Sequence, residues 1–318
     1  MRSFCLFLLL AIAASPFLRG QEQSRGHFRL TMERSQVGER RTQLTLTASP
    51  GSVLYQISRE LPYDTPLPKI HLFADGTVLL VDVFAGAYER YAENGRMVER
   101  FAFNGKISPN HERIGFLSGN DSSAVLFISE PGQSESRVLI LDSHGTLKLD
   151  QAIQGSFASG LEISPVGNMI ALGTYSWEGS SLAFRTEFLR TDGMAVSSID
   201  REFKGGSWSP QGNSFVVYGR NLATVFDIEK NEIVSTSDLG DNRVVHDVLW
   251  DGPVPLIVSS PPPRLESGAW IYSQLSVLNL ADQKVTYRST GQPFRRVKLE
   301  ENAGEISVNI DGRLVRIR

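Results

Sequence analysis

Residues 161–172 read LEISPVGNMIAL: one apolar run ends at Ser164-Pro165, turns at Gly167 and is followed at once by another. Proline has no N–H to give to a ladder, so it ends a strand where that hydrogen bond is no longer needed. Glycine two positions later allows the positive φ that a tight reversal requires. The stretch therefore predicts two antiparallel strands joined by a Ser-Pro-x-Gly turn.

The same unit recurs along the chain. ISPNHERIGF begins at Ile107 and WSPQGNSFVV begins at Trp208. Looser copies with a glycine in the turn occupy residues 72–84, 249–260 and 299–310. From Gly76 to Gly304 the spacing averages about 45 residues, which is the period of four-stranded propeller blades and too long for leucine-rich or ankyrin repeats.

A second hairpin signal alternates with the first. It consists of an apolar-alternating strand, a tight polar turn and another strand, and each copy follows its own Ser-Pro or Asp-Gly turn. The turns fall at Asn94-Gly95, His144-Gly145, Asp192-Gly193, Lys230-Asn231 and Asp282-Gln283. Two hairpins per repeat give four strands, so the sequence predicts an all-β propeller of four-stranded antiparallel blades.

The repeats set the expected blade boundaries. The sixth blade starts near Phe294 and is one strand short. Propellers commonly close the ring with an N-terminal strand, and the strand-like residues 43–49 and 52–58 are available. We therefore favour six blades; if those strands and residues 27–34 form their own sheet, the count is seven. The first five blades are expected at residues 68–103, 104–153, 154–203, 204–238 and 239–292.

The first 20 residues have the layout of a secretory signal peptide. Arg2 precedes a short apolar run, Phe4–Ala14, and small residues follow. Cys5, the only cysteine, lies in this run without a lipoprotein pattern, so the mature chain would lack disulfides. We expect a bacterial periplasmic or secreted protein with no transmembrane segment after cleavage; a retained anchor is the alternative. Residues 21–318 are expected to form one domain, with 21–60 as closing strands.

The composition of the chain limits the kinds of binding partner that we expect. The net charge is −3 and 41% of the residues are hydrophobic, which provides enough apolar material for a large core. Neutralising phosphates requires a basic face, so nucleic acid is not an expected partner. We expect a monomer that meets an envelope or extracellular protein, a peptide or a glycan.

The repeated Ser-Pro-x-Gly unit resembles the WD40-like repeat of the TolB type, found in exported bacterial β-propellers. The resemblance is good around the three Ser-Pro copies and weaker elsewhere. It implies a propeller, often an exported one, and interaction roles as often as catalysis. The middle turn residues depart from the usual Asp-Gly: they are Asn110-His111, Val166-Gly167 and Gln211-Gly212.

The sequence contains no recognisable set of catalytic or metal-binding residues. The five histidines lack the spacing of a zinc site, and there is no Gly-x-Ser-x-Gly elbow. Asp75 and Asp82 flank one strand, and related six-bladed lactonases bind Ca²⁺ through acidic side chains in the channel. Asp75 is better explained as a turn residue. We predict no cofactor, catalytic residue or metal ligand, with Ca²⁺ expected only if the chain is a hydrolase.

Ligands on propellers usually meet the face that carries the loops between blades and the turns between second and third strands. We call this the loop face. Arginines beside aromatics there are typical of recognition surfaces. The candidate ligand-binding residues are Trp177, Glu178, Arg220, Asn242, Arg243, His246, Arg295 and Arg296.

Three functions remain open at this point. The favoured one is a non-enzymatic binding scaffold for a protein, peptide or glycan at the loop face. The alternative is a metal-dependent hydrolase or lactonase with a site in the central channel. A third is a module that stabilises a larger envelope complex.

Overall fold

A computed structural model describes residues 20–317 except for several short segments. It forms 29 strands in the described part of the chain. The first 19 residues lie outside that part, and with them all of the predicted signal peptide except Gly20; the Ser-Pro copy at residue 108 also lies outside it. The chain divides into two compact units, residues 1–104 and 105–318, which are described separately. The undescribed segments are 1–19, 35–40, 49–50, 61–66, 83–86, 103–113, 130–134, 155, 267–268, 290–291, 303 and 318.

The first unit contains two four-stranded antiparallel sheets, each in chain order. Alternate residues of β2, among them Leu30 and Met32, are buried with Ile70 and Leu72 of β5 in one apolar cluster. The first sheet consists of β1 (Gly20–Arg25), β2 (Phe28–Arg34), β3 (Arg41–Ala48) and β4 (Ser52–Glu60). The second consists of β5 (Lys69–Leu72), β6 (Val78–Asp82), β7 (Ala87–Tyr91) and β8 (Met97–Ala102).

The expected role of the N-terminal strands as closing strands is not what the structure has. β3 and β4 pair with each other, and β3 also pairs with β2, so they build a sheet of their own. The Gln23 side chain ties this sheet to the next, donating to Ile70 O at 2.9 Å and accepting from Leu72 N at 2.8 Å. With this sheet the described chain has seven sheets of three or four strands, which supports the seven-blade alternative over six.

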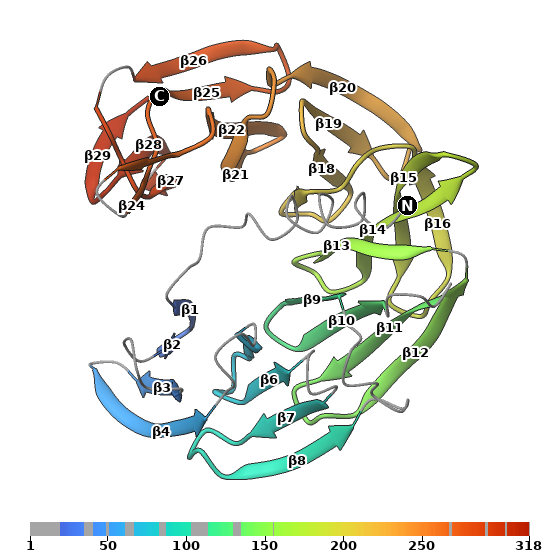
Figure 1. Ribbon diagram of the computed structural model, residues 1–318, viewed down its shortest axis with the longest axis vertical. Coiled ribbons are helices and arrows are strands. Elements are labelled where there is room, and N and C mark those ends of the chain that lie inside the picture. Colours follow the sequence, from blue (N-terminus) through green and yellow to red (C-terminus); the bar gives the residue numbers. More distant parts are fainter. Residues whose placement is uncertain are drawn as a thin grey trace. The chain divides into compact units, whose positions relative to one another are not determined.

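The second unit has four four-stranded sheets, a three-stranded sheet and a small hairpin, which follow one another from green to red in Figure 1. The first two sheets consist of β9 (Ile114–Gly119), β10 (Ser123–Ser129), β11 (Glu135–Asp142) and β12 (Leu147–Gln154), and of β13 (Phe157–Ile163), β14 (Met169–Glu178), β15 (Ser181–Arg190) and β16 (Ala195–Ile199). The third consists of β17 (Gly205–Trp208), β18 (Ser214–Tyr218), β19 (Leu222–Asp227) and β20 (Glu232–Asp238).

The last sheets depart from this plan. In the fourth sheet a hairpin is inserted between the second and third strands, so the order is β21-β22-β25-β26. The final sheet has three strands, and among the described residues no fourth strand joins it. The strands are β21 (Val244–Asp251), β22 (Val254–Ser260), β25 (Leu275–Asn279) and β26 (Lys284–Ser289), the inserted β23 (Arg264–Glu266) and β24 (Ala269–Ile271), and the final β27 (Val297–Asn302), β28 (Glu305–Ile310) and β29 (Arg313–Arg316).

The predicted boundaries of the repeats agree with these sheets. In one repeat, however, the first strand was predicted on the wrong side of the Ser-Pro pair. In the repeat at 104–153, β9 comes after Ser108-Pro109 instead of ending there. The turn between its first two strands is built by Asn120, whose Oδ1 accepts from Ser122 N at 3.1 Å and Ser123 N at 2.9 Å. An Asn turn replaces the Ser-Pro turn in this sheet, which the sequence reading missed.

The Ser-Pro-x-Gly turn is closed by its serine. Ser164 is buried, and its Oγ accepts from Met169 N at 3.1 Å and donates to Asn168 Oδ1 at 3.0 Å. Gly167 N bonds Ser164 O at 2.9 Å, and Gly167 has φ of +74°. The turn from Ser209 to Ser214 repeats the pattern, with 3.1 Å from Ser214 N to Ser209 Oγ. The motif is therefore Ser-Pro-x-Gly-Asn, and the prediction of a structural turn is confirmed.

Side chains also link the first strands of successive sheets in the second unit. Ser118 Oγ of β9 accepts from Ile163 N of β13 at 3.1 Å. Trp208 Nε1 of β17 donates to Glu162 O of β13 at 3.3 Å. These bonds fix each sheet on the one before it, and so position the loops that the sheets carry.

Candidate binding pocket

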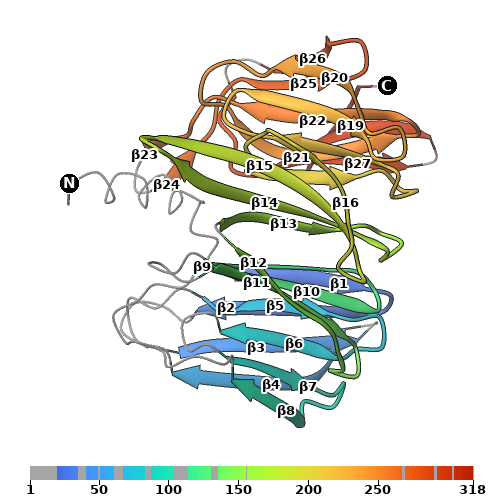
Figure 2. The same ribbon diagram turned by 90° about the vertical axis from the view of Figure 1, so that its right-hand side faces the viewer.

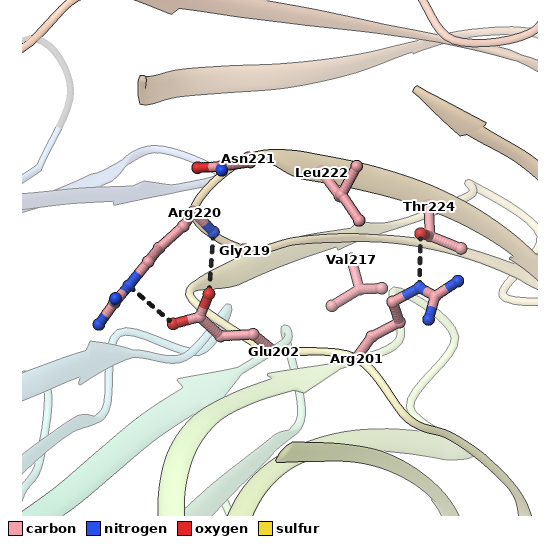
Figure 3. Close-up of a pocket in the computed structure, with 8 residues that line it drawn as sticks. All are labelled: Arg201, Glu202, Val217, Gly219, Arg220, Asn221, Leu222 and Thr224. Atoms are coloured by element: carbon pink, nitrogen blue, oxygen red, sulfur yellow. Dashed lines mark hydrogen bonds and ion pairs between the residues drawn. The ribbon is translucent and has the colours of Figure 1, made fainter. Parts of the chain in front are cut away.

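A pocket of about 210 Å³ opens between the sheets β13–β16 and β17–β20 (Figure 3). One wall is the connection that follows β16, and the other is the turn between β18 and β19. Both belong to the loop face on which the sequence placed the ligand site. The pocket is lined by Arg201, Glu202, Val217, Gly219, Arg220, Asn221, Leu222 and Thr224.

Glu202 holds the turn that forms the second wall. Its Oε2 accepts from Arg220 N at 2.9 Å, and its Oε1 lies 3.6 Å from Arg220 Nε. Gly219 makes this approach possible, because a Cβ there would lie 2.9 Å from Glu202 Oε2 and 3.2 Å from Glu202 O. The Arg220 guanidinium is thereby held at the pocket rim, as Figure 3 shows.

Arg201 forms the floor. Its Nε donates to Thr224 Oγ1 at 3.2 Å, and its Nη1 donates to Asp200 O at 2.9 Å. Thr186 Oγ1 donates to Arg201 O at 3.2 Å, which fastens the segment to β15. The charged group is therefore placed by the neighbouring strand and by its own backbone.

A larger pocket of about 570 Å³ adjoins the first and shares Arg201, Glu202 and Leu222 with it. It lies along the outer half of the long hairpin formed by β14 and β15. Its other lining residues are Ser156, Thr174, Ser176, Glu178, Ala183, Phe184, Arg185, Glu187 and Asp200. Together the two pockets make a continuous recess lined by both charged and apolar side chains, which we call the paired pocket.

Carboxylates outnumber guanidinium groups in the larger pocket. Arg185 Nε lies 3.5 Å from Asp200 Oδ1, which compensates one of the acidic groups. Burial raises the pKa of Glu187, and the charge of Arg185 opposes that shift only in part. A carboxylate in this position gains from a cationic partner, since an opposite charge offsets the cost of desolvation.

Two predicted site residues meet at the paired pocket. Arg220 lines the smaller pocket and Glu178 lines the larger one. Trp177 precedes Glu178 in β14 and is 58% exposed, although it does not line either pocket. Asn242 lies close by, because its N donates to Asn221 Oδ1 at 3.4 Å.

The other predicted residues lie elsewhere in the second unit. Arg243 is used structurally, donating from Nε to Ser259 Oγ at 3.0 Å and from Nη2 to Ser259 O at 2.8 Å. The backbone N–H groups of Arg295 and Arg296 donate to Asp311, at distances of 2.8–3.2 Å. These residues lie on the fourth and last sheets, and they do not contribute to the paired pocket.

His246 is a partly buried histidine that packs against aromatic rings. Its ring lies 4.6 Å from Tyr272 and 5.7 Å from Phe294, centroid to centroid, and its Nε2 lies 2.8 Å from Ser260 Oγ. Burial, with the nearby charge of Arg243, lowers its pKa to about 4. The ring is therefore neutral at physiological pH, and its contacts join β21 to the residues around Tyr272 and Phe294.

The sequence reading missed Arg201, Glu202, Glu187 and Leu222. The available signal was the dense run of charges at 200–204, which follows a strand and lies on the loop face. Glu187 gave no signal, because it stands inside a strand and not in a turn or loop. Its exposure to the pocket depends on where β16 ends.

A second set of polar side chains links the first strands of neighbouring sheets. Ser118 Oγ donates to Glu162 Oε2 at 2.9 Å, and burial raises the pKa of Glu162 to about 7. The Tyr218 hydroxyl reaches this region over Gly205, where a Cβ would lie 2.1 Å away. Burial, with the charges of Glu162 and Asp247, raises the pKa of Tyr218 to about 12. The Glu162 carboxyl group therefore loses its proton near neutral pH.

The chemistry expected for a hydrolase finds no support. Asp75 Oδ1 accepts from Thr77 N at 2.9 Å, as the turn interpretation predicts. Within the described residues, no three His, Cys, Asp or Glu side chains are grouped so that they could hold a metal ion. In the same part of the chain, we find no helix with the length and apolar character needed to cross a membrane.

Comparison with solved structures shows a WD40-like β-propeller fold. The chain is similar to the Dos1 propeller (TM-score 0.59, 12% identity, 88% of this chain and 72% of that one). It is also similar to BamB from Moraxella catarrhalis (TM-score 0.56, 11% identity, 92% and 81%). A chain of a mitotic checkpoint complex is comparable (TM-score 0.55, 16% identity, 92% and 83%). The sequence matches no family model and no curated protein.

Proposed function

We propose that the chain is a non-enzymatic binding protein that takes a protein partner at the paired pocket. The observation that carries this proposal is the pocket itself, a recess on the loop face where two sheets bring together Arg201, Glu202 and Arg220. Arginine is enriched at protein interfaces because its planar fork recognises carboxylates and stacks on aromatic rings. Similarity to propeller proteins supports an interaction scaffold.

The surroundings of the pocket suit a protein surface. Leu222 is 40% exposed at the centre of the recess, and Trp177 is 58% exposed on the hairpin beside it. An apolar anchor surrounded by charged groups is the arrangement that concentrates binding energy, since the rim excludes water from the centre. We therefore place Leu222 at the centre of the interface and the guanidinium groups at its border.

Export from a bacterial cell and a TolB-like relationship are part of the proposal. They are supported by the Ser-Pro-x-Gly units and by the positive and apolar character of residues 2–14. The mature protein would act as a monomer in the periplasm or outside the cell. N-terminal sequencing of protein from the periplasmic fraction tests export: an intact Met1 on cytoplasmic protein would contradict it.

The test of binding is capture from the native envelope extract with matched variants. Leu222→Asp and Arg201→Glu should each abolish recovery of one defined partner, identified by mass spectrometry. Val166→Asp is the control, because Val166 is 57% exposed on a turn between first and second strands, away from the pocket. Equal recovery with all three variants would overturn the proposed site.

A further inference from the structure

We propose that the paired pocket binds an extended peptide segment of the partner as an added strand along β15, with basic and apolar side chains alternating in that segment. The inference rests on the proposed function and specifies its partner. Strand addition needs an unpaired strand edge, room beside it and side-chain sites of period two. Each of these is present at the outer half of the β14–β15 hairpin.

The unpaired edge is the segment Ser181–Arg185. On one side β14 pairs with all ten residues of β15, from Ser181 to Arg190. On the other side β16 pairs only with Thr186–Leu189. In the described part of the chain, no strand follows β16 along that edge. About half of β15 therefore presents alternate N–H and C=O groups outward.

The space beside this edge is the larger pocket. β16 ends at Ile199, and the chain turns out of the sheet there, with Arg201 N donating to Ile199 O at 2.9 Å. The connection then runs on through Asp200 and Glu202, which line the pocket. An added strand would therefore continue the line of β16 above the point where β16 leaves it.

The two faces of the hairpin differ in chemistry. Cross-strand pairing places Ala183 opposite Ser176 and Arg185 opposite Thr174, and Glu178 and Glu187 share this face. The other face carries Leu182 opposite Trp177 and Phe184 opposite Tyr175. Because paired residues point to the same face, a strand added to β15 would place its side chains alternately on the polar and on the aromatic face.

The charges select a basic residue for the polar face. The larger pocket contains Glu178, Glu187, Asp200 and Glu202 against Arg185 and Arg201. Asp200 is paired with Arg185 and Glu202 with Arg220, whereas the described residues give Glu178 and Glu187 no ion pair. A lysine or arginine would compensate these two, and an apolar residue would cover Phe184.

The probe is a synthetic peptide of about seven residues that alternates lysine and valine, added to the intact protein. Isothermal titration calorimetry should show saturable binding that weakens with salt. A peptide of the same composition with lysines and valines in separate blocks should bind at least about tenfold more weakly. Equal affinity for both peptides would overturn the inference.

Backbone methylation separates strand addition from simple charge attraction. In an added strand, only alternate peptide N–H groups face β15. N-methylation of one alternating set should weaken binding at least about tenfold, while methylation of the other set should leave it within about threefold. Equal losses for both sets, or none, would overturn strand addition.

Variants locate the site. Glu187→Gln with Glu178→Gln should weaken binding of the probe at least about tenfold. Glu229→Gln is the control, since Glu229 is exposed in the turn between β19 and β20, away from the loop face. Binding of oligosaccharides on a glycan array, with no binding of the peptide, would overturn the inference. The protein-capture test with Leu222 variants is separate, so the proposed function can survive if the peptide fails.

Discussion

The two sheets that flank the paired pocket are alike at one end and different at the other. β13–β16 and β17–β20 share the Ser-Pro-x-Gly-Asn turn, and their turns contact each other, since a Cβ on Gly212 would lie 3.0 Å from Val166 Cγ2. At the loop face, β14 and β15 have ten residues each, whereas β18 has five and β19 has six. The end with the Ser-Pro-x-Gly-Asn turns, which we call the framework end, is the same in both sheets. The two sheets differ at the loop face.

The fourth sheet also differs from the other sheets at the loop face. Its insertion, β23–β24, also lies between the second and third strands, and Figure 2 shows it and the β14–β15 hairpin reaching out on the same side of the second unit. Leu265 and Trp270 on this insertion are 61% and 53% exposed. Both extensions of the loop face therefore carry an exposed tryptophan, Trp177 or Trp270, whereas the turns at Ser164 and Ser209 have buried serines.

The largest expected effect comes from the core that the two sheets share. Phe188 lies 5.1 Å from Phe226 in a stacked arrangement and 5.6 Å from Phe215 edge-on. Phe188→Ala should lower the free energy of unfolding by about 3–5 kcal/mol, because the cavity cannot close between two rigid sheets. Urea denaturation measures this. A loss below about 1 kcal/mol would mean that the sheets pack independently.

The next effect distinguishes equivalent positions of β13 and β17. Counting back from the turn serine, Glu162 in β13 corresponds to Ser207 in β17. The folded state raises the pKa of Glu162 from about 4.5 to about 7, so it retains a proton that the unfolded state releases. Stability is therefore lost as pH rises from about 4.5 to about 7, by up to about 3 kcal/mol.

Glu162→Gln removes this dependence. At about pH 8 the variant should be more stable than the wild type by up to about 3 kcal/mol, and at about pH 4 the two should be equal. Melting temperatures across this range measure the difference. Ser207→Ala is the matched control and should give the same difference from wild type at both values. A wild-type stability that does not change between them would disprove the assignment.

A smaller effect tests the identity of the two framework turns. Ser164→Ala and Ser209→Ala each leave a strand N–H without its side-chain partner, at Met169 and Ser214. Each variant should cost about 1–3 kcal/mol, the penalty for an unsatisfied donor, and the two costs should agree within about 0.5 kcal/mol. Chemical denaturation of both variants decides whether the turns are energetically equivalent.

The smallest effect comes from removing the difference between the sheets. Replacement of residues 177–182 by a two-residue turn makes the β14–β15 hairpin resemble the β18–β19 turn. Glu178, Gly179, Ser180 and Ser181 are exposed, so the free energy of unfolding should change by less than about 0.5 kcal/mol. A larger loss would show that the hairpin belongs to the framework. Differential scanning calorimetry is sufficient to measure it.

The repeat made the sheets predictable, and local turn chemistry is the reason. Gly167 and Gly193 lie in predicted turns and have φ of +74° and +89°, and Asn231 adopts +54°. These residues specify their conformation without distant partners. The assignment of the N-terminal strands was wrong because either pairing satisfies the same alternation. Only tertiary contacts such as Gln23 with Ile70 distinguish them.

The site could be predicted only as a face. Glu178 and Arg220 could be placed on the loop face from the sequence, because turn positions follow from strand order. Arg201 and Glu187 join them through side-chain directions and through the early end of β16, neither of which is encoded in a local pattern. The contacts of Arg243 with Ser259 and of His246 with Tyr272 could not be predicted, because each joins residues from different strands or loops.

The order of strands in the second unit has a kinetic consequence. Within each sheet of that unit, strands that pair follow one another in the sequence, apart from β22 and β25, which are separated only by the inserted hairpin. Contacts between sheets also join segments about one repeat apart, as from Ser118 to Glu162. The entropy cost of loop closure is therefore low at every step. A chain that folds from its N-terminal end onward can add one sheet at a time to the sheets that have already folded. Folding should advance as a front along the chain.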